Sequence, residues 1–294
     1  MKDRIILFLI YITAFSVGLI IGNSYTGLNL IMRSAMIVFA TVVVIWLFSF
    51  LTDNSSVFDP YWSVAPPFFI LYFWISSYGF RLFGSGSWFT NARFVLILFL
   101  VTFWGIRLTF NFLRNWKDLK QEDWRYVDFR KKTGFLYWAV SFIGIHLFPA
   151  VMVFMGSLSI WVALTKGVSQ MNFLDITGII FTGIAIWLEA RSDKELHQYI
   201  QQTPEGGKTM KTGLWAISRH PNYLGEITFW WGLYLFALAA NPSFWWVVIG
   251  PVSITLMFVF ISIPMIEKRL MERKNDYADY CRKVPMLLPF RSQK

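Results

Sequence analysis

The sequence predicts an all-α integral membrane protein, a polytopic bundle of about eight transmembrane helices with both termini in the cytoplasm. The chain of 294 residues is 56% hydrophobic, 19% aromatic and only 15% charged, with a mean hydropathy of +0.50, whereas soluble domains are typically about 25% charged. Long apolar runs recur along it and are continuous rather than alternating, which favours helices over strands. The positive charges cluster between these runs.

Each predicted span is an apolar run of about the length that crosses the hydrocarbon core. The first run could be a signal peptide, but no A-x-A-like cleavage site follows it, so we expect an anchor. The predicted spans are residues 5–22, 29–51, 61–80, 93–113, 135–156, 173–190, 223–240 and 244–266.

The distribution of basic residues sets the predicted topology. With the N-terminus inside, the cytoplasmic segments hold 22 of the 27 Lys and Arg residues, as the positive-inside rule requires. The net charge of +10 is therefore explained by topology and by a polyanionic cofactor, without nucleic acid. These segments are residues 1–4, 52–60, 114–133, 191–222 and 267–294.

Residues 135–165 fit this pattern least well. They are apolar throughout and would form a helix about 46 Å long at 1.5 Å per residue, too long for one upright span and short for two. Pro149 and the pair Gly156–Ser157 could break the helix. We expect one span plus a short interfacial helix, with two short segments as the alternative.

The first polar cluster is "FDPYWSVAPP", residues 58–67, at the entrance to the third span. Asp59 could simply cap that helix. It could also act as a proton donor, because partial desolvation raises a carboxyl pKa towards neutrality. Tyr61 could be an interfacial aromatic residue or part of the site. Arg107 lies within the fourth span and needs an acid, so we hypothesise that it pairs with Asp59.

The second cluster runs from residue 187 to residue 226 and ends in "SRHPNYLGE". Pro221 favours an extended His220 and a helix that begins near Asn222, whose free N–H groups favour an anion. Glu226 lies one turn inside the membrane helix, where an acid is seldom kept without a partner or a role. Glu189 and Asp193 share a helix face, where they could bind ribose hydroxyls or a basic partner, or mark a solvated helix end.

The third cluster, residues 267–290, has the pattern of an amphipathic helix on the cytoplasmic surface. Its basic residues could bind lipid headgroups or clamp phosphates, and Tyr277 and Tyr280 are spaced to present their phenols to one side. His146 lies alone in a span, so we expect a core or interhelical hydrogen bond for it. The single cysteine, Cys281, excludes an internal disulfide, and no metal site is predicted.

"SRHPNYLGE", an apolar helix and then "DYADYCRKVPMLLPF" together resemble the steroid 5-alpha-reductase-like C-terminal domain, and more narrowly the bacterial DUF1295 family, over residues 55–290. R-H-P-x-Y-x-G is also shared with isoprenylcysteine carboxyl methyltransferases. The resemblance implies a membrane bundle that holds NADPH in a cytoplasmic-facing cavity. It divides the chain into an N-terminal hairpin, residues 1–54, and a membrane domain, residues 55–294, and favours a bacterial inner membrane.

The resemblance also implies roles for single residues. Asn222 and Glu226 match the family's cofactor-binding Asn and acid, and Asp193 matches an Asp of its N-x-x-S-D pattern, in which Glu189 stands for the Asn. Asp59, followed by "PYWSVAP", matches the catalytic acid. Trp104 stands where steroid reductases carry their catalytic Tyr, so either Tyr61 or Tyr126 substitutes, or the chemistry differs.

We therefore expect an NADPH-dependent reductase of a C=C bond conjugated to a carbonyl in a hydrophobic substrate from the bilayer. The alternatives are a membrane methyltransferase that uses S-adenosylmethionine and a non-catalytic lipid-binding protein. Membrane lipids are expected partners; nucleic acid and an obligate protein partner are not. The predicted catalytic residues are Asp59, Tyr61 and Arg107, and the predicted cofactor-binding residues are Asn222, Glu226, Asp193, Arg219, His220, Tyr223, Lys211, Arg269, Tyr277 and Tyr280.

Overall fold

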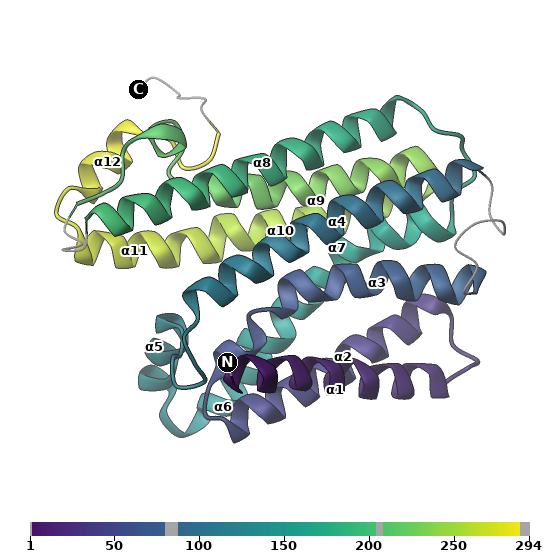
Figure 1. Ribbon diagram of the computed structural model, residues 1–294, viewed down its shortest axis with the longest axis horizontal. Helices are drawn as coiled ribbons and strands as arrows, with labels where there is room; N and C mark the ends of the chain where they lie inside the picture. The colour runs from purple at the N-terminus through teal and green to yellow at the C-terminus, as the bar shows by residue number, and fades with distance from the viewer. Residues whose placement is uncertain (1, 80–87, 204–207, 289–294) are drawn as a thin grey trace. The chain divides into compact units, whose positions relative to one another are not determined.

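A computed structural model describes residues 2–79, 88–203 and 208–288. Helices are the only regular structure within these residues (Figure 1). Parts of four predicted segments lie outside them: residue 1 of the first cytoplasmic segment, residue 80 of the third span, residues 204–207 of the link before residue 222, and residues 289–294 at the end of the chain. The chain forms two compact units, Met1–Thr165 and Lys166–Lys294. The predicted division after residue 54 stays a prediction.

Unit 1 contains the first five predicted spans. Its α1–α2 hairpin packs closely because a Cβ added at Gly18 or Gly22 would meet Thr41 or Ile37 of α2 within 2.5 Å. In the same way, Gly105 brings α4 against the backbone of α3 at Ser63. The elements are α1 (Lys2–Ser24), α2 (Leu30–Leu51), η1 (Ser55–Phe58), α3 (Tyr61–Tyr78), α4 (Trp88–Asn115), α5 (Trp124–Thr133), η2 (Gly134–Leu136), α6 (Tyr137–Val140), η3 (Ser141–Leu147) and α7 (Phe148–Thr165).

The break predicted at Pro149 or Gly156–Ser157 is wrong. The helix continues from Tyr137 to Thr165 through a π-helical turn, Ser141–Leu147, which comes just before Pro149. The wider turn accommodates the proline, which has no N–H and crowds the carbonyl four residues earlier. The real break lies at Gly134, whose φ of +54° ends α5.

Unit 2 is built on the long pair α8 (Phe173–Gln202) and α9 (Pro221–Ala240), which run side by side (Figure 1). A capping box between Asn172 and Asp175 starts α8. Gly232 lies so close to α8 that an added Cβ would meet Thr182 at 2.6 Å. The other elements are η4 (Gly213–Ala216), η5 (Pro242–Val248), α10 (Ile249–Met257), η6 (Phe258–Ser262), α11 (Ile263–Arg273) and α12 (Tyr277–Lys283).

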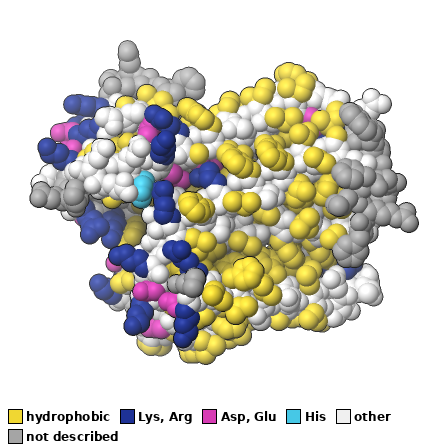
Figure 2. All heavy atoms as spheres, viewed as in Figure 1, with side chains coloured by type: hydrophobic (Ala, Val, Ile, Leu, Met, Phe, Trp, Pro, Cys, Tyr) yellow, Lys and Arg dark blue, Asp and Glu magenta, His cyan; other side chains and the backbone are white. Residues whose placement is uncertain are grey.

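Membrane-compatible helices dominate both units. Six helical stretches within the described residues are long and apolar enough to cross a membrane, and they include 2–24, 30–51, 91–115 and 173–202. These helices expose many large apolar side chains on their outer faces. Phe99 and Phe260, for example, are each more than half exposed. In Figure 2, Lys and Arg gather in unit 1 around α5 and in unit 2 around α11 and α12. The predicted all-α membrane fold is confirmed; eight spans and cytoplasmic termini stay predictions.

Candidate functional site

In unit 1, a carboxyl and a phenol meet where two helix ends are fixed by capping side chains. Asn54 caps η1 by accepting a hydrogen bond from the Ser56 N–H at 2.8 Å, and Asp59 ends this short helix. Asp123 caps α5 and pairs with Arg125 at 2.8 Å. The first turn of α5 thereby directs the Tyr126 hydroxyl to Asp59, where it donates to Oδ1 at 2.5 Å.

The Asp59 carboxyl titrates near neutrality. Burial raises its pKa from 3.8 to about 7; the positive charge of Arg125 opposes this effect, the negative charge of Asp123 adds to it, and hydrogen bonds from Tyr126 and Ser56 oppose it. Arg125 is only a partial counter-charge because its guanidinium is already paired with Asp123. The pair of Asp59 and Tyr126 can therefore hold or release a proton close to pH 7.

A polar shell fixes η1 in front of α5. The backbone N–H of Ser55 donates to Glu122 at 2.8 Å, and the Asp123 N–H donates to the Ser56 hydroxyl at 2.8 Å. Tyr137 bonds both Ser55, at 2.7 Å, and Glu122, at 3.1 Å. The segment that carries Asp59 is thus held on both sides by side chains that are themselves hydrogen-bonded.

Asp59 and Tyr61, two of the predicted catalytic residues, lie close together in the chain but have different partners. Asp59 does not cap α3 with its side chain; its carboxyl bonds Tyr126. Tyr61 is 1% exposed and stacks on Phe58 with ring centroids 5.0 Å apart, and its hydroxyl has no partner among the described residues. Of the two candidate phenols, Tyr126 is therefore the one that contacts the acid.

The positive charge that lowers the pKa of the Asp59 carboxyl in unit 1 is that of Arg125. The hypothesised pair of Asp59 with Arg107, on α4, stays a prediction. Trp104 is fully buried and packs where the resemblance places a catalytic Tyr. His146 makes the expected interhelical bond, with Nε2 at 3.0 Å from the Ser49 hydroxyl.

In unit 2, α9 begins as predicted, with Pro221 as its first residue after His220. Arg219 donates through Nε to Oε1 of Glu267 at 2.7 Å, and His220 Nε2 lies 2.8 Å from the same oxygen. The His220 ring stacks on Tyr223 with centroids 5.6 Å apart. An acid on α11 therefore joins the segment before α9 to α11.

The Arg219 guanidinium is also committed to the C-terminal segment. Its Nη1 donates to the carbonyls of Cys281 at 3.1 Å and Val284 at 2.9 Å. The backbone N–H of Arg219 donates to Pro285 at 3.0 Å. With these bonds and the pair to Glu267 in place, Arg219 anchors the C-terminal segment, and its role in binding the cofactor stays a prediction.

Two acids are buried where α8 meets α9. Glu189 is 2% exposed, so a solvated helix end is wrong for it; an added Cβ at Gly225 would meet its Cγ at 2.6 Å. Glu226 is 5% exposed and accepts a hydrogen bond from the Trp230 indole at 3.2 Å. Asn222, at the start of α9, is partly exposed and accepts from the Tyr223 N–H at 3.1 Å.

The predicted surface helix over 267–290 is wrong. Residues Ile263–Arg273 continue the preceding span, and a separate short helix, α12, follows. Tyr277 and Tyr280 are 2% and 3% exposed and form a small core with Val284, because burying two rings outweighs presenting them to water. Their cofactor role stays a prediction.

The remaining predicted cofactor residues are less enclosed. Lys211 is paired with Asp276 at 2.7 Å, and the lysine side chain is 44% exposed. Arg269, on α11, and Asp193, one turn beyond Glu189 on α8, are partly exposed. The sequence reasoning missed Glu267, although an acid next to an apolar run was the signal that could have found it.

Together, the fold and these sites define an all-α membrane protein. One unit holds an acid with a pKa near neutrality, and the other holds two buried acids. The chain belongs to the DUF1295 family, whose model, described as "Protein of unknown function (DUF1295)", matches residues 45–284. It is also similar to uncharacterized protein C594.04c of the fission yeast Schizosaccharomyces pombe, with 24% identity over 290 residues, 91% of this chain and 82% of the yeast protein. No solved structure matches.

Proposed function

We propose that the protein is a membrane reductase that uses NADPH to reduce a C=C bond conjugated to a carbonyl in a hydrophobic substrate. The observation that supports this best is the hydrogen bond of 2.5 Å between Tyr126 and Asp59. Such a reduction adds a hydride and a proton, and an acid with a pKa of about 7 is suited to give and regain that proton at neutral pH.

Asp59 and Tyr126 have distinct parts in this proposal. In its protonated form Asp59 donates to the phenol oxygen of Tyr126, which leaves the phenol proton to bond and polarise the substrate carbonyl. When the phenol gives up its proton, Asp59 replaces it. Arg125 and Asp123 hold the first turn of α5 and so fix the direction of the phenol. NADPH, when bound, supplies the hydride.

The residues of unit 2 fit the hydrogen-bonding groups of a dinucleotide. Glu226 and Glu189 are buried carboxylates that can accept from amide or amino N–H groups, and Asn222 is partly exposed at a helix N-terminus. For the phosphates, the exposed Lys211 is the better cation because its pair with Asp276 can exchange with water. Arg219 has no such freedom, since its guanidinium is held by Glu267 and two carbonyls.

Membership of DUF1295 supports the wider relation to steroid 5-alpha-reductase-like proteins, which we include in the proposal. A methyltransferase is the second candidate, because two buried carboxylates at α8 and α9 also suit the sulfonium cation of S-adenosylmethionine. A non-catalytic lipid-binding protein is the third.

The first experiment identifies the cofactor. The full chain is purified in detergent without added cofactor, and the small molecules that it retains are identified by mass spectrometry. NADP(H) supports the reductase, S-adenosylmethionine supports the methyltransferase, and titration with each compound tests a preparation that retains neither. Binding of S-adenosylmethionine without binding of NADPH would refute the proposal.

The second experiment tests the acid pair. NADPH oxidation is followed by absorbance with a panel of hydrophobic enones in wild type and in Tyr126→Phe. Loss of a general acid typically costs about 100-fold or more in rate. Tyr137→Phe is the matched control, because it also removes a buried phenol bonded to a carboxylate. Equal losses in both variants would mean that the Tyr126 hydroxyl is structural.

A further inference from the structure

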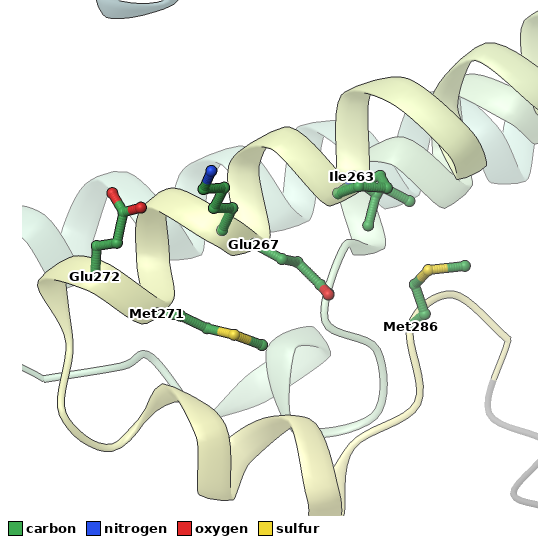
Figure 3. A pocket seen from close by; sticks show the side chains of 7 residues that line it. Ile263, Glu267, Met271, Glu272 and Met286 are labelled. Atoms are coloured by element: carbon green, nitrogen blue, oxygen red, sulfur yellow. The ribbon is translucent and has the colours of Figure 1, made fainter.

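An open groove of about 480 Å³ runs along α11 in unit 2. None of the predicted site residues lines it, although its Glu267 contacts Arg219 and His220. Its walls are Ile263, Pro264 and Met271 of α11 and Met286 of the segment after α12. Figure 3 shows Glu267 and Met271 projecting from α11 on the side where Met286 lies, on the segment after α12. The volume falls within the range of about 300–1,000 Å³ that is usual for small-molecule sites.

The walls suit a flexible apolar ligand. Two of the four apolar side chains are methionines, whose unbranched thioethers adapt to ligands of different shape. Met271 is 52% exposed, which is costly in water unless something covers it. A long hydrocarbon body would cover these side chains without requiring one fixed shape.

Glu267 provides the polar anchor of the groove. Its Oε1 already accepts from Arg219 at 2.7 Å and lies 2.8 Å from His220 Nε2. Its Oε2 has only a long contact of 3.5 Å with Arg219. Since a carboxylate oxygen can accept two hydrogen bonds, Oε2 has capacity for a ligand donor.

The charges around the groove select the kind of donor. Glu267 and Glu272 line it together with Lys268, and Arg219 pairs with Glu267. Two carboxylates are thus balanced by two cations, so neither an anionic nor a cationic headgroup gains much there. The groove therefore favours a ligand group that donates a hydrogen bond to Oε2 and carries no charge. A neutral hydroxyl has both properties.

We propose that this groove binds a hydrophobic alcohol, with the hydrocarbon body against Pro264, Met271 and Met286 and the hydroxyl donating to Glu267. The helix that carries the groove is the last part of the apolar stretch Pro242–Arg273, which is long enough to cross a membrane. In the proposal, an alcohol dissolved in the bilayer reaches the groove along this helix. The inference requires no catalytic activity and is independent of the proposed reductase.

The test is photolabelling of the full chain in phosphatidylcholine nanodiscs with a long-chain alcohol that carries a diazirine in its chain. Labelled peptides are mapped by mass spectrometry, and the same probe with its hydroxyl methylated is the matched ligand. We expect labels on residues 263–272 and on the peptide with Met286. The ether should need at least about tenfold more probe for half-maximal labelling, since a hydrogen bond to a charged group is lost.

Met271→Glu places a charge in the apolar wall at an exposed position and should reduce labelling at least about tenfold. Ile217→Glu is the control, because Ile217 of unit 2 is 53% exposed and does not line the groove. Labels that lie elsewhere, equal labelling by alcohol and ether, or no effect of Met271→Glu would each overturn the proposal. Competition by added phosphatidylglycerol but not by a free alcohol would assign the groove to anionic headgroups and overturn it as well.

Discussion

Replacing Asp59 by asparagine should remove a pH-dependent loss of stability. Burial raises the pKa of the Asp59 carboxyl from 3.8 to about 7, so the folded chain keeps this proton at pH values where the unfolded chain has released it. Between pH 4 and pH 7 the folded state binds more protons than the unfolded state. Its stability therefore falls as the pH rises through this window.

The size of the effect follows from the two pKa values. One pKa unit corresponds to about 1.4 kcal/mol, so moving from 3.8 to about 7 corresponds to about 4 kcal/mol for the ionised folded state. An asparagine side chain has nearly the same shape as the aspartate that it replaces and carries no charge at either pH. The difference in free energy of unfolding between Asp59→Asn and wild type should thus grow by about 4 kcal/mol from pH 4 to pH 8. This corresponds to on the order of 10 °C in unfolding temperature.

The assay is thermal unfolding of both proteins in detergent at a series of pH values. A difference between them that grows with pH supports the reasoning, and a difference that stays constant refutes it. Asp53→Asn is the control for loss of a carboxylate, because the Asp53 side chain is 77% exposed and water screens both its charge and its pair with Arg130. Infrared spectra add a direct measure, since the band of a protonated carboxyl should disappear near pH 7 in wild type only.

Three further predictions concern unit 2. Gly225→Ala should destabilise the protein by about 1–3 kcal/mol, because the added Cβ would lie 2.6 Å from a side-chain carbon of α8; Gly183→Ala, with nothing within 4 Å, should be neutral or slightly stabilising in the same thermal assay. Glu267→Ala should cost about 3–5 kcal/mol, since it removes the counter-charge of the half-buried Arg219 and the hydrogen-bond partner of His220. Burial raises the pKa of Asp276, but the hydrogen bond from Lys211 outweighs this effect and lowers the pKa to about 2. The stabilisation that Asp276 provides is therefore complete above about pH 4 and lost as the pH falls to 2. A pH titration of unfolding should show this loss in wild type but not in Asp276→Asn.

The helices were predictable from the sequence because their signals are local. An apolar run fixes most of each span, and single residues fix the ends: Asn172 and Asp175 cap α8, and Pro221 starts α9. The interior of 135–165 was not predictable in the same way. A proline signals a disturbance, but whether the helix breaks or widens into a π turn depends on the helices that pack around it, and η3 packs on α2.

The last part of the chain shows a different limit. Residues 267–290 combine charged and aromatic residues at helical spacing, which is also the pattern of a surface helix. The structure instead divides them at Lys274, and Tyr277 and Tyr280 pack against Leu270 and Val284. The sequence contained no local signal for that choice, because the gain comes from burial between two short segments.

The partners of the polar residues were the least predictable feature. Asp59 and Tyr126 are 67 positions apart, and Arg219 and Glu267 are 48 apart. A polar residue at the end of a span indicates that some partner exists, but the partner depends on which helix ends become neighbours. The charges of the sequence suggested Arg107 as a partner of Asp59, but they gave no sign that α5, with Tyr126 and Arg125, also lies next to this acid.

The two acids at the centre of these clusters differ in one respect that decides their roles. Glu267 has a direct cation partner, since Arg219 contacts it at 2.7 Å and holds the C-terminal segment as well. The direct hydrogen-bond partners of Asp59 are neutral hydroxyls, and its nearby cation is shared with Asp123. A carboxylate with its own cation has little tendency to take up a proton, whereas one with neutral partners exchanges a proton near pH 7. This difference is why we assign proton transfer to Asp59 and hydrogen-bond acceptance to Glu267.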